Sequence, residues 1–515
     1  MKKTLKKFAA VGLTLTSVVG LVACGSKNNT TDSKKETVDW ASVEKPGKFT
    51  VMVDGTVVKE TNGAAEFYKY YKELTGLDIE WIRPDHSSYA DSVKNTFASG
   101  DLPDVVLLNS DYLANFASNG YLWDMTDAWE QSATKNSGRL TEMADAVMAG
   151  NVLAGPDGTK ALYGFSPTRG NGCCTYVKAS ALKAAGLDVD KVANETMTYD
   201  QYYDMLKKIQ AASPNKNYVI APYTNYLPEF YQDAQFTFYL KDGKYVDGFS
   251  EEAMQKAMDR LKTAIADKIL DPATQNASTK EARNKFTNKD ANLASSVFTY
   301  WAGTWDKNLT KLLPDTTDSL VPMKPIKEVG KYVERLAPAW AITYKAYEDG
   351  KAEGIFKYFI DTMLDGGDIQ VAWEYGAKGT HWDDKAETYT VAGKDGKEGK
   401  TYTAKEGEFH NLPSPETPST LTTKNHIDPD LSIAGFGDKE DPGHKAQDPI
   451  ITECYKMFNA NCEMVEVLPT TDVLSNNITD INTKRVEVLS QVVLGTKTYD
   501  EAMADYNSQV GAKVT

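Results

Sequence analysis

Residues 98–111, ASGDLPDVVLLNSD, decide the fold of this chain. Gly100 can adopt the left-handed conformation that ends a helix, and Pro103 favours an extended conformation in the residue before it. The apolar run at 105–108 then predicts a strand, which ends in polar side chains. The stretch therefore predicts a helix that stops sharply and a strand that follows it at once.

The sequence on the N-terminal side alternates strands and helices in the same way. Residues 48–54 and 77–82 predict strands, and apolar side chains recur at helical spacing over 64–74 and 89–97. Gly76 is placed to end the first of these helices. This regular alternation predicts a parallel, doubly wound α/β sheet.

Polar side chains follow two of the predicted strands. Asp54 ends the strand at 48–54, and Asn109 and Asp111 follow the strand at 105–108. Ligands of open α/β sheets bind in the crevice beyond the carboxyl ends of the strands. We therefore expect these three side chains to contact a ligand.

Length and charge limit the class of function. The chain has 515 residues, of which 41% are hydrophobic and 25% charged, and a formal charge of −15. This is ordinary globular material, long enough for two or three domains. Residues 1–23 carry four lysines and no acid, so without them the charge is −15 − 4 = −19. Such a balance argues against nucleic acid or an anionic membrane surface as a direct partner and favours a small molecule.

The N-terminus has the layout of an exported lipoprotein. Four lysines precede the apolar run Phe8–Ala23, which is too short and too diluted for a membrane span and predicts a signal peptide over residues 1–23. Residues 21–24, LVAC, match the bacterial lipobox, which predicts a diacylglycerol on Cys24. Residues 24–44 are then a flexible tether, since 25–37 contain no apolar side chain. The chain would touch the membrane only through this lipid.

The remaining cysteines are too few for a disulfide framework. Cys173 and Cys174 are adjacent, and a vicinal disulfide and two buried thiols are the alternatives, with the buried thiols favoured. Cys454 and Cys462 lie eight residues apart in a helical pattern, too far apart for a bridge along one helix.

Several stretches together resemble a known family, the family 1 extracellular solute-binding proteins that supply ABC importers, especially the large lipoproteins of Gram-positive bacteria. The quoted residues 98–108 carry the resemblance with the GYLWDMTD of 120–127 and the ALYGFSPTRG of 161–170. It continues in ASALKAAGLDVDKV, TYDQYYDMLKKI (198–209), ARNKFTNKDANLASSVFTYW (282–301), and the stretches APAWAITYKAYEDGKAEGIFKYFIDTML and EYGAKGTHW within 337–382. Lys178, Ala179 and Ser180 depart from the usual Arg-x-Asp, and SPNKNY (213–218) lacks the carboxylates of the calcium loop of some members, so we predict no metal.

The resemblance implies a two-lobed fold like that of the periplasmic binding proteins, with a hinge that the chain crosses several times. The first lobe would comprise residues 45–165 and 325–382, and the second 166–324 and 383–515. Within the second, residues 383–411 alternate polar and β-branched side chains and predict a small hairpin insertion. Capping boxes are predicted at Thr198 with Gln201 and at Thr498 with Glu501.

Aromatic residues supply the other candidate ligand contacts. Flat aromatic faces match the apolar faces of sugar rings, while polar side chains bond the hydroxyl groups. For any single tryptophan, a position in the core and a contact with the ligand are equally expected. The candidates are Tyr223, Tyr226, Trp301, Trp305 and Trp340, with Arg169 and Asn171 beside the expected hinge.

No catalytic or cofactor motif is convincing. GKDGKEGKT (393–401) has the wrong glycine spacing for a phosphate-binding loop, and the five histidines show no paired metal spacing. No Gly-x-Ser-x-Gly elbow is present. We therefore expect a binding protein and not an enzyme, without cofactor or metal.

The sequence as a whole predicts a monomeric, lipid-anchored receptor on the outer face of the cytoplasmic membrane. It would bind a carbohydrate, an oligosaccharide by preference, and deliver it to an ABC permease. Two alternatives remain: a secreted lipoprotein glycoside hydrolase, which needs two carboxylates across a cleft, and a peptide-binding or sensor relative of the same fold.

Overall fold

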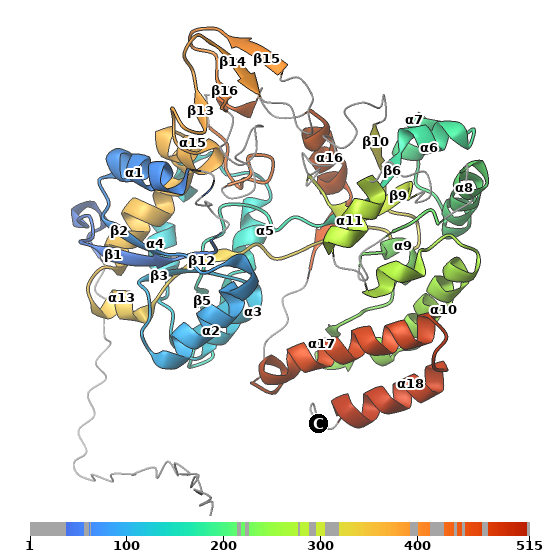
Figure 1. The fold of residues 1–515 in the computed structure, drawn as a ribbon. Helices are drawn as coiled ribbons and strands as arrows, with labels where there is room; N and C mark the ends of the chain where they lie inside the picture. Colours follow the sequence, from blue (N-terminus) through green and yellow to red (C-terminus); the bar gives the residue numbers. More distant parts are fainter. Residues whose placement is uncertain are drawn as a thin grey trace, which may run out of the picture. The chain divides into compact units, whose positions relative to one another are not determined.

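The computed structural model describes most of the chain after the N-terminal segment. The described residues are 38–55, 61, 63–213, 218–221, 226–276, 279–287, 295–303, 319–391, 400–412, 427–436, 440–444, 449–465 and 472–511 (Figure 1). Residues Val43–Thr515 form one compact unit, distinct from Met1–Ser42. None of the helices in the described part of the chain is both long enough and apolar enough to cross a bilayer.

The first sheet has four strands in the order β12-β3-β1-β2. The strands are β1 (Phe49–Met52), β2 (Ile79–Ile82), β3 (Val105–Leu108) and β12 (Ala339–Ile342). β1 runs parallel to β2 and β3, which confirms the parallel order predicted from the sequence. β12 comes from far along the chain and pairs antiparallel with β3, with Ala339 opposite Leu108.

The helices of the first sheet begin and end close to where the sequence predicts. They are α1 (Ala64–Thr75), α2 (Tyr89–Ser99) and α3 (Ser110–Ser118). Gly76 ends α1 with φ 68°, and its N–H donates to the Lys72 carbonyl at 2.8 Å. Gly100 ends α2 with φ 78°. These left-handed positions favour glycine because it has no Cβ.

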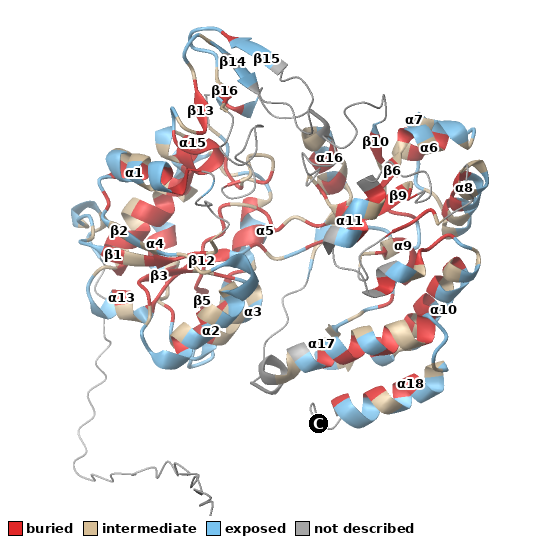
Figure 2. Cartoon of the chain, viewed as in Figure 1, coloured by how far each residue is buried: buried red, intermediate tan, exposed pale blue. Residues whose placement is uncertain are grey.

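The second sheet has three antiparallel strands in the order β10-β6-β9. They are β10 (Leu320–Pro322), β6 (Cys173–Lys178) and β9 (Val297–Trp301), and the strands of both sheets other than β2 are largely buried (Figure 2). Helices contribute the rest of this core: α6 (Ala179–Ala184), α7 (Val189–Asn194), α8 (Tyr199–Ala212), α9 (Pro228–Tyr231), α10 (Glu252–Ala266), α17 (Asp472–Val493) and α18 (Tyr499–Tyr506). Both predicted capping boxes are confirmed, at Thr198 of α8 and at Thr498 of α18.

Short elements complete the described chain. The helices are α4 (Thr126–Glu130), α5 (Ala144–Ala149), α11 (Thr279–Thr287), α13 (Tyr344–Glu348), α14 (Ala352–Ile355), α15 (Asp368–Tyr375) and α16 (Pro449–Ala460). The strand pairs are β4 (Val152–Ala154) with β5 (Lys160–Leu162), β7 (Phe238–Lys241) with β8 (Lys244–Asp247), and β11 (Tyr332–Glu334) with β17 (Cys462–Met464). The single helical pattern expected for Cys454 and Cys462 is wrong, because α16 ends at Ala460 and Cys462 begins β17.

The predicted hairpin insertion is confirmed, and its base contacts α15. β14 (Glu387–Val391) and β15 (Lys400–Ala404) form an antiparallel pair, and β13 (Trp382–Asp383) pairs with β16 (His410–Asn411). Phe409 packs against Val371, Tyr375 and Trp382, two of which belong to α15. The base of the hairpin therefore packs on α15, because the apolar side chains of Val371 and Tyr375 face it.

Three segments connect the two sheets, and we call them the crossing segments: residues 165–172, 334–339 and 427–434. Isolated bridges pair the first segment with the other two, Gly172 with Glu334 and Thr168 with Ser432, and Phe165 pairs with Trp340 of β12, directly after the second segment. The first and second segments lie so close that a Cβ on Gly170 would stand 1.7 Å from the Arg335 carbonyl oxygen. Only glycine fits at this position.

A buried ion pair joins the first and second crossing segments. Arg169 Nε donates to both carboxylate oxygens of Glu334, at 2.9 and 3.1 Å, and Arg169 Nη2 donates to Oε2. The side chains are 8% and 0% exposed. A bidentate arginine–carboxylate pair satisfies both charges, which burial alone would destabilise.

The core of the second sheet contains a buried acid. Glu229 in α9 is 1% exposed, and its Oε1 accepts a hydrogen bond from the Thr175 hydroxyl of β6 at 2.5 Å. Burial raises the pKa of Glu229 to about 7. The folded protein therefore keeps a proton on this side chain at pH values where the unfolded chain has lost it.

Stability is expected to fall between about pH 4.5 and 7 because of Glu229. In this window the folded state binds more protons than the unfolded state, so the free energy of unfolding decreases as the pH rises, by about 3 kcal/mol in total. Glu229→Gln should reduce the difference in unfolding free energy between pH 5 and pH 8 by most of that amount, measured by urea denaturation. Glu66→Gln, an exposed position on α1, is the matched control and should leave the difference unchanged. An unaltered pH dependence in Glu229→Gln would contradict the assignment.

The ion pair between crossing segments gives a second expectation. Arg169→Met leaves the Glu334 carboxylate buried without its partner and should destabilise the protein by about 3 kcal/mol in urea denaturation. The double variant Arg169→Met/Glu334→Met removes both charges and should recover most of this loss. A single variant as stable as the natural protein would show that the pair is not the buried contact described.

Candidate functional site

Three predicted ligand contacts follow neighbouring strands of the first sheet. Asp54 follows β1, and its carboxylate lies 2.7 Å from Nδ1 of the exposed His86. Asn109 begins α3, where its Oδ1 accepts the Tyr112 N–H at 2.9 Å. Asp111 is exposed in the first turn of the same helix. Since β1 and β3 are parallel neighbours, these groups lie at one edge of the sheet, and the Asn109 oxygen already serves as the helix cap.

A second group forms where β9 ends beside the crossing segments. The Trp301 ring carries the Arg335 guanidinium on its face, 3.9 Å from the ring centre. The Tyr226 ring lies edge-on to Trp301, with the centres 5.5 Å apart. We call these three residues the Trp301 cluster. Trp301 and Tyr226 are half-buried and Arg335 is exposed, so the cluster combines apolar ring surface with a cation that donates hydrogen bonds.

The backbone around Asn171 builds this cluster. Asn171 has φ 61°, in the left-handed region that asparagine tolerates better than most residues. Its carbonyl accepts the Arg335 N–H at 2.9 Å, and its side-chain oxygen accepts the Gly172 N–H at 2.7 Å. Cys173 pairs with Trp301 across β6 and β9. Asn171 and Trp301, predicted from distant parts of the sequence, are therefore held at neighbouring positions.

Arg335 is the residue that sequence reasoning missed. It lies in the second crossing segment, between Glu334 and Leu336. It stacks on Trp301 because Gly172 pairs with Glu334. This pairing joins distant parts of the sequence, so no local sequence pattern predicts it. The closest available signal was its place beside the APAWAIT stretch that carries the family resemblance.

Two other predicted contacts are occupied by the protein itself. Arg169 is the buried cation paired with Glu334. Trp340 lies in β12 with 5% of its surface exposed, and its ring packs edge-on against Phe359 and Trp373 at 5.6 and 5.7 Å. Both side chains therefore serve the fold in this structure, and neither belongs to the Trp301 cluster. Cys24, Tyr223 and Trp305 lie outside the described residues.

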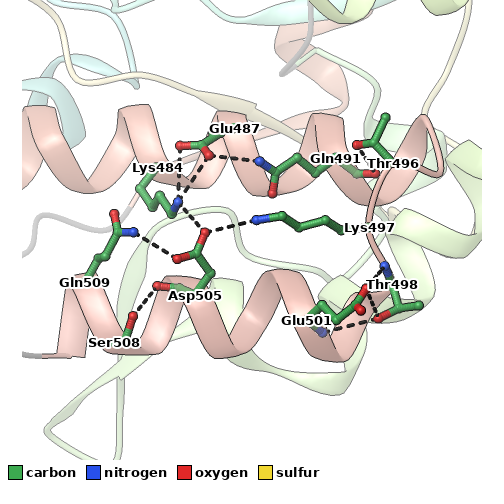
Figure 3. Close-up of polar contacts among 10 residues, drawn as sticks. All are labelled: Lys484, Glu487, Gln491, Thr496, Lys497, Thr498, Glu501, Asp505, Ser508 and Gln509. Carbon is green, nitrogen blue, oxygen red and sulfur yellow. Dashed lines mark hydrogen bonds and ion pairs between the residues drawn. The ribbon is translucent and has the colours of Figure 1, made fainter.

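Two adjoining hollows lie elsewhere, along α17. Their volumes are about 420 and 270 Å³, and they share Thr483 and Glu487 in their linings. The polar groups beside them are paired with one another, as Figure 3 shows: Lys484 Nζ lies 2.8 Å from Asp505 Oδ2 and 3.2 Å from both carboxylate oxygens of Glu487. These contacts hold α17 on α18, so we place the candidate site at the Trp301 cluster and not in these hollows.

The described residues offer no obvious metal centre. In the part of the chain that the structure describes, no three His, Cys, Asp or Glu side chains are grouped so that they could hold an ion. The residues of the Trp301 cluster also supply no carboxylate or imidazole ligand. The chemistry of the site is therefore that of aromatic faces, an amide and a guanidinium.

Solved structures of low sequence identity share this fold. The alginate-binding protein AlgQ2 has a TM-score of 0.59 at 16% identity, covering 92% of this chain and 96% of its own. An HMO-binding, ABC-transporter-associated solute-binding protein from Bifidobacterium longum infantis has a TM-score of 0.59 at 13% identity, covering 91% and 96%. The N-glycan transport protein NgtS of Streptococcus pneumoniae has a TM-score of 0.55 at 14% identity, covering 91% and 95%.

These structures are two-lobed solute-binding proteins, so the predicted fold class is confirmed. No curated protein matches the chain in sequence. A family model described as bacterial extracellular solute-binding protein matches residues 66–374, from α1 to the end of α15. The match covers more than half of the chain and includes every strand of the two sheets except β1, and the chain therefore belongs to the bacterial extracellular solute-binding proteins.

Proposed function

We propose that this protein is a lipid-anchored receptor that binds an oligosaccharide outside the cell and delivers it to an ABC permease. The observation that carries the proposal is the Trp301 cluster. A half-buried tryptophan beside a tyrosine gives two apolar ring faces, and Arg335 and Asn171 add donors and an acceptor for hydroxyl groups. Such a mixture suits a sugar ring, which has apolar faces and a polar rim.

The relatives support the same ligand class. AlgQ2 is named for alginate, NgtS for N-glycan transport, and a Listeria monocytogenes neighbour was solved with cycloalternan. Each of these names describes an oligomeric or polymeric carbohydrate. An oligosaccharide would contact the Trp301 cluster with some of its rings and the polar strand ends at Asp54, Asn109 and Asp111 with others.

The crossing segments suggest how the ligand is held. The three crossing segments connect the two sheets. Such connections are the usual basis for hinge closure of two lobes around a ligand. Closure would bring the polar edge of the first sheet over the ligand bound at the Trp301 cluster. We propose that the closed monomer is the form that the permease recognises, since only that form signals a loaded receptor.

Binding and its dependence on Trp301 can be tested by calorimetry with a panel of neutral and acidic oligosaccharides. Trp301→Ala removes the largest ring surface of the cluster and should weaken binding at least about tenfold, equivalent to about 1.4 kcal/mol. Trp123→Ala is the matched control. Trp123 is also half-buried, and its ring stacks on Tyr347 with the ring centres 6.3 Å apart. Its N–H donates to Ile342, at the end of β12 that lies away from the second crossing segment. The affinity of this control variant should equal that of the natural protein. Release of new reducing ends during the titration would instead favour a hydrolase, and no binding of any sugar would refute the proposal.

The anchor gives a separate expectation. Cys24→Ala removes the predicted lipid attachment without touching residues 43–515, so the protein should appear in the culture medium while its sugar affinity stays unchanged. Immunoblots of washed cells and medium, with calorimetry on the released protein, measure both. Retention of the variant on cells to the same extent as the natural protein would show that Cys24 does not anchor the chain.

A further inference from the structure

We propose that Cys174 and Cys454 form a disulfide when the protein folds in an oxidising extracellular environment. Cys174 lies in β6 and Cys454 in α16, and both are fully buried in one apolar cluster. Their sulfur atoms are 3.8 Å apart, a non-bonded contact in which both thiols are free. A bond would bring them to about 2.05 Å, so the two sulfur atoms must approach by less than 2 Å.

The groups around Cys454 favour its thiolate. Cys174 and the Tyr176 hydroxyl, which is 2.9 Å away, contact the Cys454 sulfur, and a hydrogen bond from Cys174 is the main reason that the pKa of Cys454 is lowered. Burial raises the pKa of Cys174. A thiolate is the nucleophile in thiol–disulfide exchange, so Cys454 is the sulfur that reacts first.

The chemistry requires an oxidant of one class, a small-molecule disulfide such as oxidised glutathione. The Cys454 thiolate attacks one sulfur of that disulfide and releases a thiolate, which leaves a mixed disulfide on Cys454. The Cys174 thiolate then attacks Cys454 Sγ and releases the second thiolate. The protein loses two electrons and two thiol protons, and the small disulfide gains both as two thiols. Because the finished site is closed to solvent, the exchange takes place late in folding, when Cys174 and Tyr176 already lie beside Cys454 but the small disulfide can still reach the sulfur atoms.

The bond would leave no buried donor without a partner. The Tyr176 hydroxyl also contacts the Trp301 carbonyl at 3.2 Å, so it keeps an acceptor after Cys454 is oxidised. The other described cysteines have different surroundings. Cys173 precedes Cys174 in β6 and so projects to the opposite face, and Cys462 Sγ lies 3.3 Å from Arg169 Nη2 and 3.6 Å from Glu334 Oε2.

The bridge would fasten α16 to the second sheet. The two cysteines are 280 residues apart, and a crosslink across so long a loop removes much conformational freedom from the unfolded chain. Tyr455, the next residue in α16, donates from its hydroxyl to Asp428 in the third crossing segment at 2.7 Å. The bond would therefore secure the helix on which that crossing segment rests.

Peptide mapping of the full chain tests the bond directly. The protein is unfolded in reductant, refolded in a mixture of oxidised and reduced glutathione, treated with an alkylating agent and digested with trypsin. We expect a crosslinked pair of peptides, GNGCCTYVK (170–178) with AQDPIITECYK (446–456). Cys173→Ser makes the assignment unique, because Cys174 is then the only cysteine in the first peptide, and the crosslink should persist in that variant.

Melting temperature gives the second measurement. Reduction should lower the melting temperature of the natural protein, Cys173→Ser and Cys462→Ser by about 5 °C, whereas Cys454→Ala should show no such shift. Full alkylation of both Cys174 and Cys454 after oxidative refolding would overturn the proposal. So would a crosslink that joins either of them to Cys173 or Cys462. These results are independent of sugar binding, so failure here leaves the proposed function intact.

Discussion

The bidentate contact between Arg169 and Glu334 is the constraint on which the arrangement of the crossing segments depends. The two residues come from different segments, and each charge is buried, so neither segment can separate without exposing an uncompensated ion. The close approach at Gly170 and the bridge between Gly172 and Glu334 join the same two segments. Arg335, which follows Glu334 directly, is thereby placed against Trp301. The geometry of the candidate site therefore depends on how the chain passes from one sheet to the other.

Polar groups near the strand ends divide into those that serve the fold and those that face outward. Asp104 is buried before β3, where its carboxylate accepts the Thr50 N–H at 2.8 Å and pairs with Lys351 at 3.2 Å. The side-chain oxygen of Asn109 caps α3, while Asp111, two residues later, is exposed. A strand-end carboxylate such as Asp104 therefore serves the fold, whereas Asp111 is exposed and stays a candidate ligand contact.

Local patterns predicted the elements that depend on neighbours in the sequence. Gly76 and Gly100 end helices, Thr198 and Thr498 begin them, and the apolar run before Asn109 is β3, because each of these features is decided within a few residues. The burial of Trp340 and Arg169 depends instead on residues that lie far away in the sequence. Trp340 is covered by Phe359 and Trp373, and Glu334 lies 165 residues after Arg169. The same reason hid the contact of Arg335 with Trp301, whereas Asn171 and Trp301 were predicted as ligand contacts from their positions, one just past Pro167 and the other after an apolar strand-like run.

The polar network between α17 and α18 has a consequence for how the protein opens locally. Asp505 is 31% exposed and bonds Lys484, Lys497 and Gln509, so water and salt reach the contacts that hold the last helix (Figure 3). On the inner side, the fully buried Arg485 bonds the Tyr506 hydroxyl and Asp247 and keeps the same helix in register. Amide hydrogens of α18 should therefore exchange with solvent through local fraying that high salt promotes, while those of the sheets exchange only on global unfolding. The contacts that hold α18 on its neighbours thus combine a salt-sensitive outer side with a buried inner side, and a fusion at this end of the chain would act first on the outer contacts.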